Sequence, residues 1–376
     1  MFITELSVNG FKNLKEIDIK PHEKINIFCG QNAQGKTNLI ESIWLCSGAR
    51  SFRGTKDKRM IGDDAQVMDV RLRFKNSFRE QEIRYAMAKP NIKEKNVSLN
   101  GVKLKAPSKL FGELNCVIFT PEDLELSKGS PDKRRQFTDL SVAQIRNSYN
   151  AVIEKYEKLI DQRNSLLKSI NWGKGRREEL EVWDVQLAQM GAYISLMRHK
   201  YIEKLGRYAK ELYSEISGDR EVLDIGYLST VYGRGELENA VDYKEELREK
   251  YLEALKNGIE EDIRAGFTQK GVHRDDVVCR INGNLVREDA SQGQHRSVAL
   301  IMKLSQAYIL NEEIDDYPVI LLDDVLSELD PSRQKFVISK IHDMQVFITC
   351  CDMNIPFDEK QHGKIFNIDK GQIKKK

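Results

Sequence analysis

One stretch of the chain combines residue types at a spacing that could hold the phosphates of a nucleotide. It reads Gly30-Gln31-Asn32-Ala33-Gln34-Gly35-Lys36-Thr37, comes after an apolar run at 25–29, and is followed by Asn38 and a helical pattern. Backbone N–H groups in such a loop and the start of the helix both favour a phosphate anion. Lys36 would reach the β- and γ-phosphates of ATP, and the Thr37 hydroxyl would ligate Mg²⁺.

A nucleotide site of this kind needs a second half, an apolar strand that ends in a carboxylate. The segment 319–322 is such an apolar run, and Asp323 and Asp324 follow it directly. We expect Asp323 to hold Mg²⁺ through water, and Asp324 to act in catalysis with Lys36 by orienting or deprotonating the attacking water. The two halves lie far apart in the sequence, so a long stretch of chain must separate them.

A third segment, Ser291-Gln292-Gly293-Gln294, permits two interpretations. Ser291 is a favourable N-cap and Gln294 completes a capping box, which would start a helix without any ligand. The same serine, the Gly293 backbone and the helix dipole also form an anion site. The segment lies shortly before the acidic strand, where ATP-binding-cassette proteins carry their signature sequence. Together with the phosphate loop, this position favours a nucleotide role.

The elements that must position these residues change in character along the chain. Residues 1–120 consist mostly of strand-like segments, whereas residues 132–217 are rich in Glu, Lys, Arg, Leu and Tyr, as long helices are. Strand-like segments return after about residue 266. We therefore expect an N-terminal part with the phosphate loop at 1–130, a helical insert at 131–265, and a C-terminal part with the acidic strand at 266–376.

Composition limits the class of protein. The chain has 376 residues and a formal net charge of +2, so bulk charge argues neither for nor against nucleic acid. The six cysteines form no CxxC pair, which favours reduced thiols inside a cell. We find no signal peptide and no apolar run long enough to span a membrane, and we therefore expect a cytoplasmic protein without a membrane partner.

Several segments distributed over the chain resemble a known family. They are GFKNLKEIDIKP, GQNAQGKTNLIESI, ARSFRGTKD, TPEDLELSKGSPDKRRQFTD, GVHRDD and LLDDVLSELD. With SQGQ and the helical insert, they resemble the SMC/ABC-type ATPases of DNA maintenance and, within these, the RecF family of bacterial recombination mediators. The resemblance implies an α/β fold: a P-loop ABC-ATPase-like head, built of a mixed β lobe and a RecA-like α/β core, with an inserted mainly helical arm.

The resemblance also implies a mechanism. Two copies would pair head to tail as a C2 dimer around two ATP molecules, and slow hydrolysis would release the dimer as a switch. Ser291 to Gln294 of one copy would cap the γ-phosphate that the phosphate loop of the other copy holds. Asp330 would lie beside the opposite site. Thr349 or Cys350 stands at the position of the family's switch histidine.

Two basic clusters could contact DNA phosphates without reading the base sequence. The clusters comprise Arg50, Arg53, Lys56, Lys58 and Arg59, and then Lys133, Arg134 and Arg135. Each cluster could equally be a solvated charged surface. The resemblance favours DNA, in particular single-strand/double-strand junctions at gaps, and implies the mediator RecR as a partner in recombinase loading during repair and replication restart.

Two other classes of protein share parts of this pattern. The soluble ATPase subunit of a transporter is the first alternative; the long insert, the SQGQ form and the hairpins predicted at Asn100-Gly101 and Asn282-Gly283 count against it. A cohesion protein with a long rod is the second, and the insert has neither a long heptad run nor a CxxC hook. We therefore expect an ATP-dependent DNA-binding ATPase.

Overall fold

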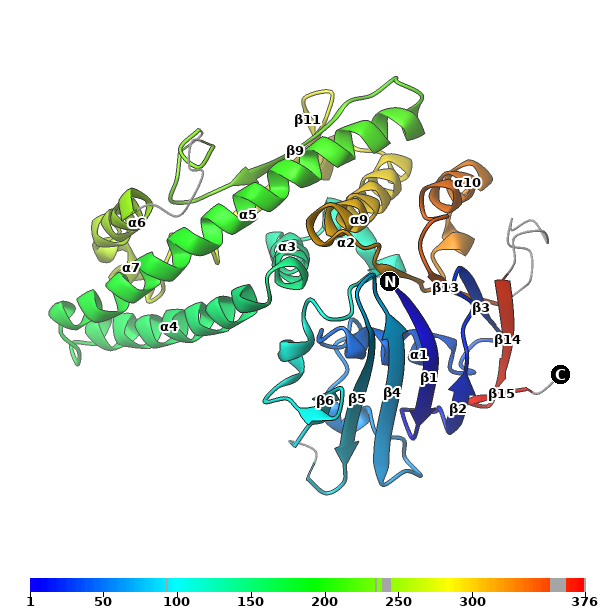
Figure 1. The fold of residues 1–376 in the computed structure, drawn as a ribbon. Helices are drawn as coiled ribbons and strands as arrows, with labels where there is room; N and C mark the ends of the chain where they lie inside the picture. Colours follow the sequence, from blue (N-terminus) through cyan, green and yellow to red (C-terminus); the bar gives the residue numbers. More distant parts are fainter. Residues whose placement is uncertain (92–93, 234, 239–244, 352–362, 375–376) are drawn as a thin grey trace. The chain divides into compact units, whose positions relative to one another are not determined.

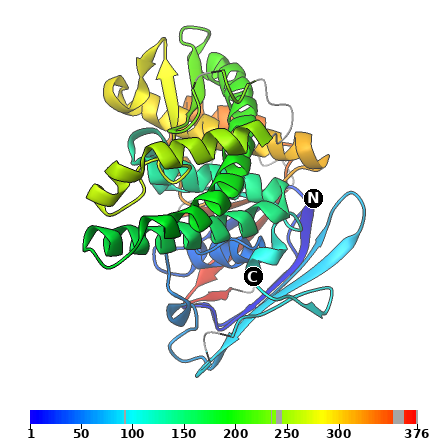
Figure 2. The same ribbon diagram turned by 90° about the vertical axis from the view of Figure 1, so that its left-hand side faces the viewer.

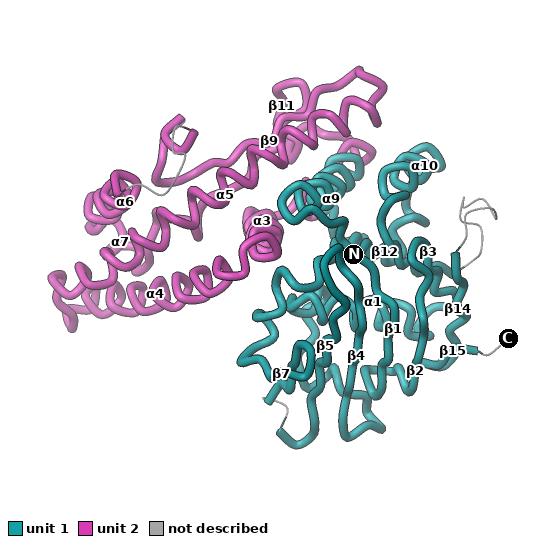
Figure 3. Tube along the Cα trace, in the orientation of Figure 1, with its two compact units in different colours: residues 1–124, 296–376 teal, residues 125–295 magenta. Residues whose placement is uncertain are grey.

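The computed structural model describes residues 1–91, 94–233, 235–238, 245–351 and 363–374 (Figure 1, and turned by 90° in Figure 2). The chain divides into two compact units, Met1–Leu124 with Arg296–Lys376 and Glu125–His295, which Figure 3 colours separately. We call them the head unit and the arm unit. The arm unit extends beyond the insert expected at 131–265, because strand β10 (Asp276–Ile281) pairs with β9 (Leu223–Leu228) inside it.

An antiparallel sheet forms one part of the head unit, and its long strands are blue to cyan in Figure 2. Its strands are, in spatial order, β2 (Glu16–Ile19), β1 (Phe2–Asn9), β4 (Val67–Lys75), β5 (Glu80–Ala88), β6 (Asn96–Leu99) and β7 (Val102–Lys103). In β4 every second side chain, from Met68 to Phe74, is buried. This alternation places one face of the sheet against the core of the head unit.

A second sheet carries the candidate site at the carboxyl ends of its strands. The strands are, in spatial order, β15 (Gln372–Ile373), β14 (Gly363–Asp369), β3 (Ile25–Cys29), β13 (Val346–Cys350), β12 (Val319–Leu322) and β8 (Cys116–Phe119). From β14 to β8 the strands run parallel. Strands β13, β12 and β8 are buried at every residue, as expected for a parallel sheet covered on both faces.

Helices and short 3₁₀ turns connect the strands of the head unit. They are α1 (Lys36–Cys46), η1 (Asp57–Arg59), η2 (Pro107–Leu110), η3 (Pro121–Leu124), η5 (Leu326–Glu328), α10 (Pro331–Lys340) and the greater part of α9 (Gln292–Ile314). Helix α1 begins directly after the phosphate loop, and α9 begins directly after Ser291. The two helix starts singled out in the sequence are therefore real helix starts.

The arm unit is built around two long helices, α4 and α5, joined by a turn in which Gly173 has a φ of 72°. Its helices are α2 (Glu125–Lys128), α3 (Pro131–Ile145), α4 (Asn147–Asn171), η4 (Arg177–Glu179), α5 (Leu180–Ser217), α6 (Glu245–Asn257), α7 (Ile259–Ala265) and α8 (Val286–Asp289). A small sheet has the order β11 (Asn284–Leu285), β10 and β9. In the described part of the chain, no helix combines the length and apolar character that a membrane crossing requires.

Several charged and polar groups inside the arm unit pair with one another. The guanidinium of the fully buried Arg163 donates to Asp184 and Asp262 at 2.6 Å each. His273, from the segment GVHRDD, contacts the hydroxyl of Tyr156 through Nδ1 at 3.0 Å. Within the GVHRDD segment, Gly271, Val272 and Asp275 are buried, whereas Arg274 is exposed.

Candidate nucleotide site

The phosphate loop joins β3 to α1 in the head unit. The ammonium group of Lys36, the first residue of α1, is buried and donates to the carbonyls of Gly30 and Gln31 at 2.6 and 3.0 Å. Gly35 precedes it with a φ of 112°, and a Cβ there would lie 2.6 Å from the Leu14 side chain, so this position requires glycine. The loop thus curls around the lysine at the N-terminal end of α1, where helix N–H groups lack intrahelical partners.

The structure brings Thr37 and Asp323 together from distant parts of the sequence. The Thr37 hydroxyl donates to Oδ1 of Asp323 at 2.8 Å, and Asp323 directly follows β12. Burial raises the pKa of Asp323, whereas the hydrogen bonds from Thr37 and Thr349 act in the opposite direction. Hydroxyl and carboxylate oxygens are ligands that Mg²⁺ accepts together with phosphate oxygens and water, so these residues fit the metal role predicted for them.

Asp324 and Thr349 complete this group of side chains. Asp324 has a left-handed φ of 54° and lines a pocket beside the phosphate loop. Its N–H donates to Oγ1 of Thr349, and the same hydroxyl donates to Oδ1 of Asp323, both at 2.9 Å. Of the two residues expected at the switch-histidine position, Thr349 therefore contacts the acids, whereas Cys350 is a buried thiol at the end of β13.

The pocket beside the phosphate loop has a volume of about 950 Å³. Asn13, in the turn after β1, also lines it and donates to the carbonyl of Ala33 at 3.0 Å, which ties this turn to the loop. Three basic residues predicted to contact DNA line the same pocket: Arg53, Lys58 and Arg59. These three basic residues could therefore contact the phosphates of a bound nucleotide as well as those of DNA. The sequence did not suggest this, because no pattern of neighbouring residues shows that the segment after α1 returns to the phosphate loop.

The remaining basic candidates differ in their burial. Three are exposed, namely Arg50, Lys56 and Lys133. Arg134 is buried and forms a bidentate ion pair with Asp276 at 2.8 and 2.9 Å, so its guanidinium is not free to contact DNA, which corrects the expectation for this residue. Arg135 is half-buried and donates to a backbone carbonyl at 2.6 Å. The cause is the helical period: consecutive residues of α3 point in different directions, so a basic triplet cannot face solvent as a whole.

Ser291 and Gln294 start helix α9 with a reciprocal capping box. The N–H of Ser291 donates to the side-chain oxygen of Gln294 at 2.8 Å, and the N–H of Gln294 donates to the Ser291 hydroxyl at 3.3 Å. Gln294 also donates to Glu221 at 2.8 Å. Ser291 and Gln292 are exposed, while Gly293 is half-buried. The capping contacts account for the helix start by themselves, and the role of this segment at a phosphate stays a prediction.

Asp330 caps the helix that follows the acidic strand. Its carboxylate accepts from the N–H groups of Ser332 and Arg333 at 3.1 Å each, at the start of α10. The guanidinium of Arg333 and these N–H groups lower the pKa of Asp330, which therefore stays ionised. The side chain is exposed, and its predicted place beside a second nucleotide site is not tested by these contacts.

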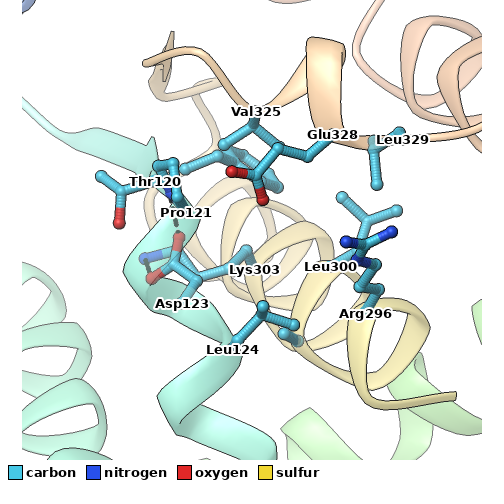
Figure 4. A pocket seen from close by; sticks show the side chains of 12 residues that line it. Thr120, Pro121, Asp123, Leu124, Arg296, Leu300, Lys303, Val325, Glu328 and Leu329 are labelled. Carbon is cyan, nitrogen blue, oxygen red and sulfur yellow. Dashed lines mark hydrogen bonds and ion pairs between the residues drawn. The ribbon is translucent and has the colours of Figure 1, made fainter. Parts of the chain in front are cut away.

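A smaller cleft of about 40 Å³ lies between the segment after β8 and helix α9, within the head unit (Figure 4). Lys303 of α9 pairs there with Asp123 at 3.5 Å, and Asp123 also accepts from the N–H of Thr120 at 2.7 Å. Burial raises the pKa of Asp123, and the Lys303 ammonium opposes that effect. The ion pair fixes the segment 120–124 to α9.

Comparison with known proteins gives full-length matches. The model of the family "RecF/RecN/SMC N terminal domain" matches residues 2–374. A protein of Alkaliphilus oremlandii described as "DNA replication and repair protein RecF" is 36% identical over 374 residues, covering 99% of this chain and 100% of that protein. A Clostridium tetani protein of the same description is 38% identical over 376 residues, with 99% of each chain covered.

Solved structures match over the same length. The "recombination mediator protein RecF-ATPrS in RecFOR pathway" matches with a TM-score of 0.89 and 36% identity, covering 99% of this chain and 97% of that chain. An Smc head domain with an extended coiled coil, from Pyrococcus furiosus, matches with a TM-score of 0.56 and 15% identity, covering 99% of this chain and 95% of that chain. At this identity the match shows the fold alone. The expected fold class, an ABC-ATPase-like α/β head with a mainly helical arm, is confirmed.

Proposed function

The chain belongs to the RecF/RecN/SMC N-terminal domain family, and we propose that it is an ATP-dependent DNA-binding ATPase of DNA replication and repair. Its class as a P-loop ATPase follows from that membership. The observation that carries the proposal is the contact of Thr37 with Asp323 beside the buried Lys36, since it joins the two halves of a nucleotide site. The relatives described as DNA replication and repair proteins support the same function.

The tasks of hydrolysis would be divided among Lys36, Thr37, Asp323 and Asp324. Lys36 exchanges its two loop carbonyls for the β- and γ-phosphates of ATP. Thr37 and Asp323 would hold Mg²⁺, which would supply positive charge to the phosphate oxygens. Asp324 orients the attacking water or accepts its proton. We expect slow turnover, as suits a switch.

ATP would join two copies of the chain as a dimer. Ser291 to Gln294 of the second copy would contact the γ-phosphate held in the first, because the exposed Ser291 hydroxyl and the positive end of the α9 dipole both favour an anion. Asp330 would lie beside the same site. Hydrolysis removes the γ-phosphate contact, so the dimer would dissociate.

The dimer would bind DNA at single-strand/double-strand junctions without sequence preference. Arg50, Lys56 and Lys133 are exposed and suit contacts to backbone phosphates. The similar RecF structure is described as part of the RecFOR pathway. We extend this description to the present chain, with recombinase loading at gaps as its task, RecR as a protein partner and the cytoplasm as its location.

Titration of gapped duplex DNA with ATP, ADP or no nucleotide, combined with sedimentation, tests the proposal. We expect a dimer that forms with ATP and whose affinity for DNA falls with salt. Lys36→Arg should reduce the ATP-dependent dimer and hydrolysis by about tenfold or more, because a planar guanidinium does not replace a compact buried ammonium group.

Lys24→Arg is the matched control for this substitution. The Lys24 ammonium also donates to two backbone carbonyls, those of His342 and Asp343, at 3.3 and 3.0 Å, but at the opposite end of β3 and on the surface. The control should therefore behave as the wild type. A wild-type chain that is monomeric in every nucleotide state, or that binds DNA regardless of ATP and salt, would overturn the proposal.

A further inference from the structure

One hydroxyl group of the head unit contacts both acidic residues that follow β12. Thr349 lies in β13 and is 3% exposed; its Oγ1 donates to Oδ1 of Asp323 and accepts from the N–H of Asp324, each at 2.9 Å. A hydroxyl has a single proton to donate and can also accept, so this group is engaged in both directions. Both of its partners belong to the ATPase site proposed above.

The register of the sheet explains why a side chain is needed at this point. The pairing of β12 with β13 ends where Leu322 lies opposite Ile348. The N–H of Asp323 still donates to a backbone carbonyl of β8 at 3.0 Å, whereas the N–H of Asp324 donates to the Thr349 hydroxyl. The hydroxyl therefore replaces a backbone acceptor just where Asp324 turns into the left-handed region, a conformation that costs a non-glycine residue free energy.

The same hydroxyl determines which oxygen of Asp323 is engaged. Oδ1 accepts from Thr37 at 2.8 Å and from Thr349 at 2.9 Å. Among the residues that the structure describes, none donates to Oδ2. Two donors on one oxygen restrict rotation of the carboxylate and leave the lone pairs of Oδ2 for a metal-bound water.

We propose that Thr349 is a positioning residue that orients the metal ligand Asp323 and the base Asp324 at the same time. The inference rests on the proposed ATPase function. It gives the residue at the switch-histidine position a contact with both acids. Without the hydroxyl, the Asp323 carboxylate could rotate and the Asp324 N–H would lose its acceptor, so Mg²⁺ affinity and the hydrolysis step would weaken together.

Two substitutions of Thr349 separate the hydroxyl from the shape of the side chain. Thr349→Val removes the hydroxyl and keeps the branched shape, and Thr349→Ser keeps the hydroxyl. In the full chain, Thr349→Val should lower kcat and raise the Mg²⁺ concentration for half-maximal hydrolysis, each by about tenfold or more, as second-shell losses do. ATP binding measured without Mg²⁺ should stay unchanged, and Thr349→Ser should restore both values.

Thr138→Val is the matched control. Thr138 is fully buried, and its hydroxyl donates to a backbone carbonyl of α3 at 2.9 Å. The control should lower the melting temperature without changing kcat or the Mg²⁺ dependence. If Thr349→Val does not fold, Thr349→Cys, whose thiol is a weak donor, carries the same expectation.

Three outcomes would overturn the inference. The first is wild-type kcat and Mg²⁺ dependence in Thr349→Val, and the second is a loss in Thr349→Val that Thr349→Ser does not restore. Both leave the proposed function standing, provided that the wild type hydrolyses ATP and that Lys36→Arg lowers its hydrolysis by about tenfold or more. The third is a wild-type chain without ATPase activity, which would remove the proposed function and this inference together.

Discussion

Asp324 illustrates how the backbone of one residue can prepare a site. It is a non-glycine residue with a φ of 54°, and it lines the pocket together with Lys36 and Thr37. A left-handed conformation costs roughly 1–2 kcal/mol for most side chains, although Asp and Asn tolerate it better than others do, and such outliers gather at functional sites. With this φ the chain turns away from the direction of strand β12, and Asp324 therefore lies at the pocket instead of continuing the sheet.

Asp324→Asn should keep the fold and abolish most of the ATPase activity. Asparagine tolerates the same backbone conformation but cannot accept a proton, so we expect hydrolysis to fall by about a hundredfold or more. ATP binding should persist, and the ATP-bound dimer should therefore outlive that of the wild type. Phosphate release and sedimentation in ATP measure the two effects.

Asp315→Asn is the control for Asp324→Asn. Asp315 is also an aspartate with a left-handed φ, of 56°, but it is exposed and does not line the pocket. The same chemical change there should leave turnover and dimer lifetime as in the wild type. Normal turnover in Asp324→Asn, or a dimer that dissociates as fast as the wild type, would exclude Asp324 as the base.

Among the elements, the turn between β14 and β15 supports the phosphate loop from outside. The N–H of Gly371 donates to the carbonyl of Gln34 at 3.1 Å, and its own carbonyl accepts from the N–H of Lys15 at 3.1 Å. The N–H of Lys370 donates to the side chain of Gln34 as well. A residue near the end of the described chain therefore joins the phosphate loop to the turn after β1.

Gly371→Ala should disturb both stability and nucleotide binding. Gly371 has a φ of 74°, and a Cβ would lie 1.9 Å from the carbonyl oxygen of Asn13. The β14–β15 turn must therefore shift relative to Asn13, which disturbs its hydrogen bond to Gln34 of the phosphate loop. We expect a loss of about 2 kcal/mol or more in the free energy of unfolding, and weaker ATP binding. Chemical denaturation and an ATP titration measure these two quantities.

Comparison with Gly101→Ala separates the steric clash at Gly371 from the strain of a left-handed backbone. Gly101 has a similar φ of 79° in the β6–β7 turn, and a Cβ there would meet no atom within 4 Å. This control should lose about 1 kcal/mol from backbone strain alone and should bind ATP normally. Equal losses in the two variants would show that the contact between Gly371 and Asn13 does not constrain the loop.

The elements with local signals could be predicted from the sequence. The two Asn-Gly turns have the positive φ at both residues that a type I′ hairpin needs: 50° and 79° at Asn100 and Gly101, and 51° and 87° at Asn282 and Gly283. The apolar run at 25–29 is strand β3, and the capping box at Ser291 does start a helix. In each case the physical cause lies within a few neighbouring residues.

Features that depend on distant partners could not be predicted in this way. Arg134 is buried and paired with Asp276, which lies far from it in the sequence. The three consecutive basic residues at 133–135 give no indication of this ion pair. Thr349 meets Asp323 only once β13 and β12 pair in parallel. The end of the arm unit depends in the same way on the pairing of β10 with β9.

At the scale of the whole molecule, the parallel sheet of the head unit and the interior of the arm unit differ in chemistry. The parallel strands of the head unit are apolar at nearly every position. The arm unit instead buries ionic and polar groups, including Arg163 with its two aspartates and His273 with Tyr156. Stability of the arm unit should therefore depend on pH through its own buried titratable groups, His273 among them.

We predict that mild acid destabilises the arm unit through His273. Burial lowers the pKa of His273 to about 4 from 6.5, and the nearby Arg274 and Arg135 act in the same direction. Between about pH 6.5 and about pH 4 the unfolded chain therefore binds a proton at His273 that the folded chain does not bind. The contribution of His273 to the free energy of unfolding is fully present above about pH 6.5 and is lost as the pH falls toward about 4. Between about pH 7.5 and about pH 5 this amounts to about 2 kcal/mol.

Substitution of His273 should remove this part of the pH dependence. Glutamine can still contact the Tyr156 hydroxyl and the Thr268 carbonyl, which the two ring nitrogens reach at 3.0 Å each, but it does not titrate. Urea unfolding in a Trp44→Phe background, in which Trp172 and Trp183 of the arm unit are the remaining tryptophans, measures the effect by fluorescence at both pH values.

The comparison between variants is needed because other buried groups titrate with the opposite sign. Burial raises the pKa of Asp275 and Asp184, so protonation of these carboxyls on acidification favours the folded state. This contribution is common to the wild type and His273→Gln and cancels in their difference. His342→Gln, at an exposed histidine, should keep the wild-type pH dependence. If His273→Gln loses as much stability as the wild type over this range, His273 is not the group that couples arm stability to pH.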